Sequence, residues 1–164
     1  EIRLSLVGSE MCIRDRGRLD EAIEDAQSMM NEGYRNSSIY GMLGYFKLLR
    51  NDDLDETTKL CEEAYDYNSD DRDIKDNLSI CYFRKGEYEK AEKISDELVG
   101  SAPNFVEGFY HGIQIAMKLN KYDKAAEYAE KLKECKRSGM TTVTEEEVNK
   151  LIQEVKNHNE NTIG

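Results

Sequence analysis

The chain has 164 residues with no Trp, only one Pro, 35% charged residues and a formal net charge of −11. This negative charge disfavours nucleic acid and anionic membrane surfaces as partners, because binding to either depends on neutralising phosphate or lipid charge. A basic partner is compatible with the charge but is not implied by it. The composition is typical of a helical protein with solvated outer faces.

Residues 1–16 differ from the remainder of the chain. Residues 3–16 carry three arginines against two acidic side chains, whereas the remainder of the chain is acidic, and the chain begins at Glu1 without a methionine. The string SLVGSEMCIRDR resembles a leader that arises when sequencing-adapter DNA is translated together with a gene fragment. We therefore treat residues 1–16 as a non-native leader and exclude them from the fold reasoning. A divergent native helix is the alternative, and either interpretation leaves room for a signal or an anchor upstream.

A periodic pattern runs through the middle of the chain. Four positions return 34 residues later, where Gly86, Tyr88, Ala91 and Leu98 become Asn120, Tyr122, Ala125 and Leu132. Leu54 and Thr57 hold two of these positions one period earlier. The spacing from Leu19 and Ala22 to Leu54 and Thr57 is 35 residues, so one extra residue is placed in the turn at Asp52–Asp53, where added backbone is solvated. A fixed period of this length predicts stacked helical hairpins with an extended curved surface that suits binding.

The pattern resembles the tetratricopeptide repeat, in which an aromatic residue or Leu follows a turn and a small residue comes three positions later. The family's Leu-Gly or Leu-Ser pair on the first helix is present as Leu43–Gly44 and Leu78–Ser79, whereas the last unit departs from it as Gly112–Ile113. The resemblance extends over about residues 17–137 and implies an all-α, right-handed α-solenoid of helical hairpins. The divisions expected after the leader are a partial repeat at 17–36, repeats at 37–71, 72–105 and 106–138, a capping helix at 139–157 and a disordered tail at 158–164.

The capping helix has its own sequence signals. Thr144 precedes Glu147 by three residues, which is a capping box, and Val143 and Val148 flank the cap as a hydrophobic staple. One apolar stripe follows at helical spacing, formed by Val148, Leu151, Ile152 and Val155. We expect this helix to cover the last apolar face of the solenoid.

Residues suited to catalysis or metal binding are sparse. The four cysteines (Cys12, Cys61, Cys81 and Cys135) have no C-x-x-C spacing, and there are only two histidines. No phosphate-binding glycine-rich loop or nucleophile elbow is present. We expect no cofactor, no metal and no enzymatic activity, and we expect a reducing cytoplasmic location with no membrane insertion within this chain.

The resemblance also implies a binding face. In this family the first helix of each hairpin lines the concave surface, and the corresponding positions that we expect to bind a peptide are Tyr45, Asn77, Ile80, Arg84, Tyr110, His111, Gln114 and Lys118. Asn77 matches the position from which many family members hold a peptide backbone with an amide. Arg84 and Lys118 are expected to form a local basic patch for an acidic side chain or a terminus. The ordinary alternative is that these residues are surface filler.

The function predicted from the sequence is a protein–protein interaction scaffold that binds a peptide segment or helix in the concave groove. Two alternatives stay open at this point. One is a structural module that self-associates or extends a larger solenoid through its N-terminal face. The other is the regulatory part of a longer enzyme whose catalytic domain lies upstream.

Overall fold

The computed structural model describes residues 13–163 and, within them, the side chains of residues 17–158. This part of the chain contains eight α-helices and no β-strand. In order, they are α1 (Ile13–Asn31), α2 (Ser37–Arg50), α3 (Leu54–Tyr67), α4 (Arg72–Lys85), α5 (Tyr88–Ser101), α6 (Val106–Lys118), α7 (Tyr122–Glu134) and α8 (Glu145–Ile163). The predicted all-α class is confirmed.

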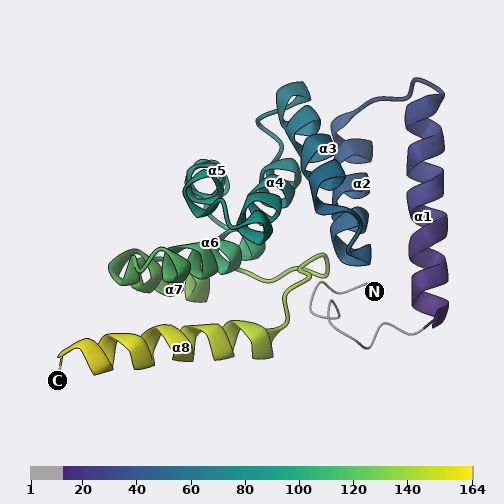
Figure 1. The fold of residues 1–164 in the computed structure, drawn as a ribbon. Helices are drawn as coiled ribbons and strands as arrows, with labels where there is room; N and C mark the ends of the chain where they lie inside the picture. Colours follow the sequence, from purple (N-terminus) through teal and green to yellow (C-terminus); the bar gives the residue numbers. More distant parts are fainter. Residues whose placement is uncertain (1–12, 164) are drawn as a thin grey trace.

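The helices form a row of antiparallel hairpins, α2–α3, α4–α5 and α6–α7, with α1 packed on α2 at one end and α8 on α6 and α7 at the other (Figure 1). Helix α2 contacts α4, and α4 contacts α6, so these three helices form one continuous inner layer. Helices α3, α5 and α7 pack against that layer. The first helices of successive hairpins therefore share a face, as the repeat pattern predicted.

The repeated turn positions have the backbone conformation that the repeat requires. Gly86 ends α4 with φ +78°, and Asn51 and Asn120 have φ +57° and +56° at the corresponding ends of α2 and α6. Glycine and asparagine tolerate this left-handed conformation best, which lets each chain reverse directly into the next helix. The extra residue predicted at Asp52–Asp53 lies in the turn between α2 and α3.

Small residues occur where helices approach closely. Ala91 and Ala125 are both fully buried. A Cβ atom on Gly112 would lie 3.0 Å from the Ser95 hydroxyl oxygen and 3.1 Å from the ring of Tyr128, so a larger residue there would require these neighbours to shift. Tyr128 replaces Ile94 of the preceding unit, and Gly112 replaces Leu78. A larger side chain on one helix is thus matched by a smaller one on its neighbour, which explains the departure at Gly112–Ile113.

Helix α8 closes the C-terminal end of the solenoid. Its apolar stripe is buried in one cluster with residues of α6 and α7, including Phe109 and Tyr128. The capping box is present: the Thr144 backbone N–H donates to a Glu147 carboxylate oxygen at 2.7 Å, and the Glu147 N–H donates to the Thr144 hydroxyl at 3.2 Å. Val143 of the staple is 4% exposed.

Three predicted boundaries differ from the observed helices. The capping helix expected at 139–157 begins only at Glu145, because residues 139–144 are not helical. Helix α8 continues to Ile163, so the disordered tail expected at 158–164 is wrong through residue 163. No Pro or Gly interrupts the helix before Gly164, and the ring of His158 stacks on Tyr122 of α7 at 4.0 Å between centroids. Helix α1 begins at Ile13, inside the leader expected at 1–16, and residues 1–12 lie outside the described residues.

Candidate binding groove on the inner face

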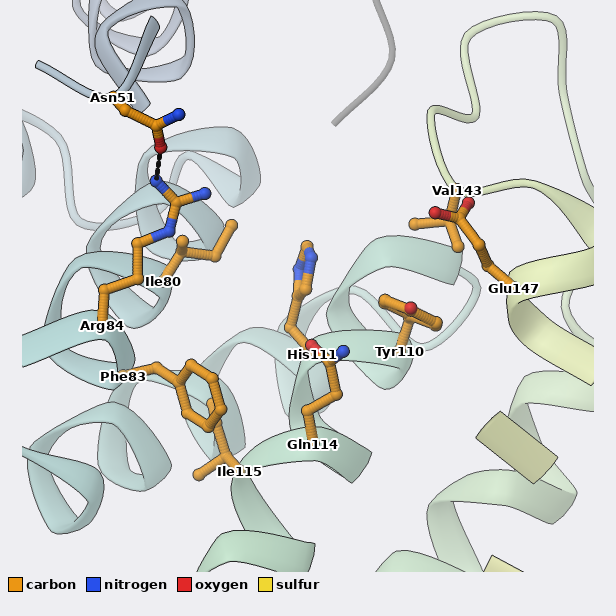
Figure 2. Close-up of a pocket in the computed structure, with 10 residues that line it drawn as sticks. All are labelled: Asn51, Ile80, Phe83, Arg84, Tyr110, His111, Gln114, Ile115, Val143 and Glu147. Carbon is orange, nitrogen blue, oxygen red and sulfur yellow. Dashed lines mark hydrogen bonds between the residues drawn. The ribbon is translucent and has the colours of Figure 1, made fainter. Parts of the chain in front are cut away.

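A groove of about 400 Å³ lies on the inner face, between α4, α6 and the start of α8. Figure 2 shows side chains from these three elements and from the end of α2 around the same hollow. Its walls are formed by Asn51, Ile80, Phe83, Arg84, Tyr110, His111, Gln114, Ile115, Val143 and Glu147. Aromatic and aliphatic side chains therefore alternate with groups that can donate or accept hydrogen bonds.

The structure brings five of the eight predicted site residues together in this groove, namely Ile80, Arg84, Tyr110, His111 and Gln114. Tyr45, Asn77 and Lys118 do not line it. Lys118 is exposed in the last turn of α6, and the groove contains Arg84 without Lys118 beside it. The basic patch expected from that pair is therefore not part of the groove.

Asn77 is buried, with 4% of its surface exposed, so the expectation that it lies exposed on the inner face is wrong. Its side-chain amide donates a hydrogen bond of 2.9 Å to the Gly41 carbonyl oxygen on the neighbouring helix α2. Because α2 and α4 pack closely at this height, the amide satisfies a backbone carbonyl of the protein itself. Asn77 thus joins two repeats rather than presenting a free amide to a ligand.

Arg84 reaches from α4 to the end of α2. Its guanidinium donates to the Leu48 carbonyl oxygen at 2.9 Å and lies 3.5 Å from the Asn51 side-chain oxygen (Figure 2). The last carbonyl groups of a helix have no partner within the helix, so a cation there is favourable. Arg84 therefore fixes α4 against α2 while its side chain still forms one wall of the groove.

A buried polar network lies behind the groove. His111 Nδ1 is 2.8 Å from Asp76 Oδ1, and their side chains are only 12% and 8% exposed. Glu107, one helical turn before His111, is also buried and accepts hydrogen bonds from the Thr142 N–H at 2.6 Å and from the Thr142 hydroxyl at 3.1 Å. The segment between α7 and α8 is thereby attached to the inner face by its own backbone.

The network affects the ionisation of its members. Burial lowers the pKa of His111, but the charge of Asp76, its hydrogen bond and the charge of Glu107 outweigh burial and the opposing charge of Arg84, so the net pKa of His111 is raised. Burial raises the pKa of Tyr45 to about 12, with further contributions from the charges of Glu107 and Asp76. Tyr45 therefore stays neutral beside the two carboxylates.

We expect the His111–Asp76 contact to make stability depend on pH. The folded-state pKa of His111 lies above its ordinary value of 6.5, so the contribution of the charged pair is fully present below that value. This contribution is lost as the pH rises through the folded pKa. Urea melts from about pH 6 to 8.5 would measure the free energy of unfolding of the parent and of His111→Gln. The difference, parent minus variant, should decrease as the pH rises.

An Asp76→Asn variant is the matched control, because it removes the charge that favours the imidazolium. Replacing His111 by Gln in the Asp76→Asn background should give a difference that no longer decreases with pH. A difference that is flat or rising in the parent would contradict the charged pair. His158 is present in all four proteins, so its contribution cancels in the comparison.

Sequence reasoning missed half of the groove wall. Phe83 precedes the predicted residue Arg84 on α4, and Ile115 follows the predicted residue Gln114 on α6. Both would have been predicted if more positions on the inner faces of these helices had been included. Val143 and Glu147 belong to the capping segment, and they were interpreted only as a staple and a capping box. Nothing in the local pattern signals that this segment turns back toward α4 and α6.

The part of the chain that the structure describes also bears on metal binding and on membrane crossing. No group of three or more His, Cys, Asp or Glu side chains within it is placed to hold a metal ion. None of its helices is both long and apolar enough to cross a membrane.

Comparisons with known proteins agree with this architecture. Residues 48–108 match the family model described as tetratricopeptide repeat. A comparison with curated proteins found no match. Among solved structures, TTC0263, a thermophilic TPR protein from Thermus thermophilus, has a TM-score of 0.67 at 14% identity, covering 85% of this chain and 73% of that chain.

Two further solved structures show the same fold. YrrB, described as a TPR protein with an unusual peptide-binding site, has a TM-score of 0.65 at 16% identity over 87% of this chain and 68% of that one. A tetratricopeptide repeat protein from Parabacteroides merdae has a TM-score of 0.64 at 20% identity over 88% of this chain and 56% of that one. At such low sequence identities, the similarity to these structures shows a shared fold only. Residues 48–108 are therefore tetratricopeptide repeat sequence, and the flanking helices continue the same solenoid fold.

Proposed function

We propose that this protein binds a short non-helical peptide segment of a partner protein in the groove between α4, α6 and the start of α8. The observation that supports this most is the groove itself, which combines apolar walls such as Ile80 and Tyr110 with the hydrogen-bonding side chain of Gln114. Apolar pockets take alternate side chains of a bound segment, and polar groups fix its register. Tetratricopeptide repeat solenoids serve as protein–protein interaction scaffolds, which is the coarser function of this fold.

The contact between Glu107 and Thr142 supports the same mode of binding. It shows a non-helical stretch of chain held on the inner face through a backbone N–H. YrrB, whose fold is similar, is described as having a peptide-binding site. By contrast, Asn77, which matches the position that many family members use for backbone recognition, is occupied in an internal hydrogen bond. The proposed site therefore lies toward the C-terminal repeats.

Random peptides displayed on phage provide a direct test, followed by fluorescence anisotropy with a fluorescein-labelled synthetic copy of the enriched sequence. Tyr110→Ala and Gln114→Ala should each weaken binding about fivefold or more, which corresponds to about 1 kcal/mol of lost contact. Both side chains are partly exposed in the groove, so the fold should survive, as circular dichroism would check.

The chain offers matched controls for both substitutions. Tyr34, which is 62% exposed in the turn after α1, and Gln153, on the outer side of α8, can be changed to Ala in the same way. Neither change should alter the affinity. Failure to enrich any peptide, or equal losses in the groove variants and the controls, would overturn the proposal.

A further inference from the structure

Two buried thiols meet where the α2–α3 hairpin packs on the α4–α5 hairpin. Cys61 on α3 and Cys81 on α4 have their sulfur atoms 3.6 Å apart, and the two residues are 2% and 0% exposed. They are 20 positions apart in the chain and lie on opposite sides of the junction between the α2–α3 and α4–α5 hairpins. The binding function uses neither of them.

The two thiols have different surroundings. A hydrogen bond with Cys61 lowers the pKa of Cys81, and Thr58 and the charge of Arg84 act in the same direction against the effect of burial. The hydrogen bond with Cys81 raises the pKa of Cys61, together with burial. Cys81 is therefore the thiol that ionises first, and Cys61 keeps its proton.

Two members of the apolar cluster that holds the cysteines also line the protein surface. Leu78 and Ile94 pack in the same apolar cluster as the two cysteines. They also line a surface hollow of about 420 Å³ between α3, α4 and α5, together with Tyr82. The cluster that holds the two cysteines thus borders a hollow open to solvent, from which a small oxidant such as hydrogen peroxide can approach.

We propose that Cys61 and Cys81 are a modification site, at which hydrogen peroxide produces an intrachain disulfide that links α3 to α4. The Cys81 thiolate attacks one peroxide oxygen, the O–O bond breaks, and the leaving hydroxide takes a proton to become water. Cys81 is then a sulfenic acid. Cys61 sulfur attacks Cys81 sulfur, the S–O bond breaks, and the leaving hydroxide takes the Cys61 proton to form a second water.

The overall reaction is balanced. Two thiols and one hydrogen peroxide give one disulfide and two waters, with two electrons passing from the sulfurs to the peroxide. The sulfur atoms need to approach from 3.6 Å to about 2.05 Å. The bond would close a loop across the junction between two repeats, and a cross-link of that length should raise Tm by about 6–12 °C.

The test uses a chain in which Cys12 and Cys135 are replaced by Ser, so that Cys61 and Cys81 are the remaining thiols. The native protein is treated with hydrogen peroxide, and the remaining peroxide is removed with catalase. The protein is then denatured in the presence of N-ethylmaleimide, which blocks any free thiol. It is digested without reductant, and the peptides are analysed by mass spectrometry. We expect one linked peptide that contains residues 61 and 81, with the loss of two hydrogen atoms and full recovery of both thiols after dithiothreitol. The oxidised native protein should also melt at the higher temperature.

Single replacements separate the roles of the two sulfurs. With Cys61→Ser, oxidation should stop at Cys81 with the gain of one oxygen atom and no cross-link. With Cys81→Ser, Cys61 should react at least tenfold more slowly. The same peptide map on the chain with all four cysteines shows whether the link forms without any replacement.

Three results would overturn the inference. The first is that both thiols remain free for the maleimide after peroxide treatment of the native protein. The second is oxidation of Cys61 or Cys81 beyond the sulfenic acid without a link between them. The third is a linked protein whose Tm is no higher than that of the reduced form.

Discussion

Phe109→Ala should lower the free energy of unfolding by about 3–5 kcal/mol, because it removes one of the largest fully buried side chains of the described residues. Phe109 is 2% exposed and lies in the cluster where α6, α7 and α8 meet. Its ring packs edge-on against Tyr128, with centroids 5.5 Å apart. Truncation would remove that contact and leave a cavity that three packed helices cannot fill. Urea melts followed by circular dichroism would measure the loss.

Two comparison variants make this result specific. Phe109→Leu keeps most of the apolar volume and should cost distinctly less than Phe109→Ala. Phe83→Ala removes the same ring from a half-buried place on the groove wall, so its cost should also be smaller. If Phe109→Ala costs less than about 1 kcal/mol, α8 does not close the solenoid as described.

Ala91→Leu should destabilise the protein by about 1–3 kcal/mol through overpacking. Ala91 is fully buried on α5, which packs against both α4 and α6. Three extra carbon atoms at this position would force the helices apart or push the new side chain out of a favourable rotamer. Thermal and urea melts of the variant and the parent would give the difference.

Lys93→Leu is the control for Ala91→Leu, since it places the same side chain on an exposed position of the same helix. Its effect should stay within about 0.5 kcal/mol. If the melts of Ala91→Leu and the parent coincide, the repeats have been aligned in the wrong register, and Ala91 does not lie at a close contact between helices.

The repeat register could be read from the sequence because its determinants are local and recur. Gly86 and Asn120 hold the same place in successive units, and both adopt the left-handed conformation that ends a helix. Ala91 and Ala125 recur with the same spacing, and both are buried. If one unit has a different residue at a repeated position, the other units still show the period, and the period identifies the fold.

The binding face could be predicted only in part. The helix faces were assigned correctly for Tyr110, His111 and Gln114, which line one groove. Asn77 was assigned to the correct helix, but its exposure was wrong, because the spacing between α2 and α4 decides whether an amide reaches a ligand or the Gly41 carbonyl. That spacing depends on Gly44, where a Cβ atom would lie 3.1 Å from the Cys61 sulfur and 3.3 Å from the Asn77 amide nitrogen.

The sequence by itself determined the helical class, the repeat period, the turn residues and the capping box, since each depends on residues within one or two helical turns or on an exact repeat. Only the tertiary structure decided that Thr142 returns to Glu107, 35 positions away, and that Cys61 and Cys81 bring their sulfurs to 3.6 Å. These contacts join residues far apart in the chain through the packing of whole helices. No local propensity or periodicity encodes the distances that such packing produces.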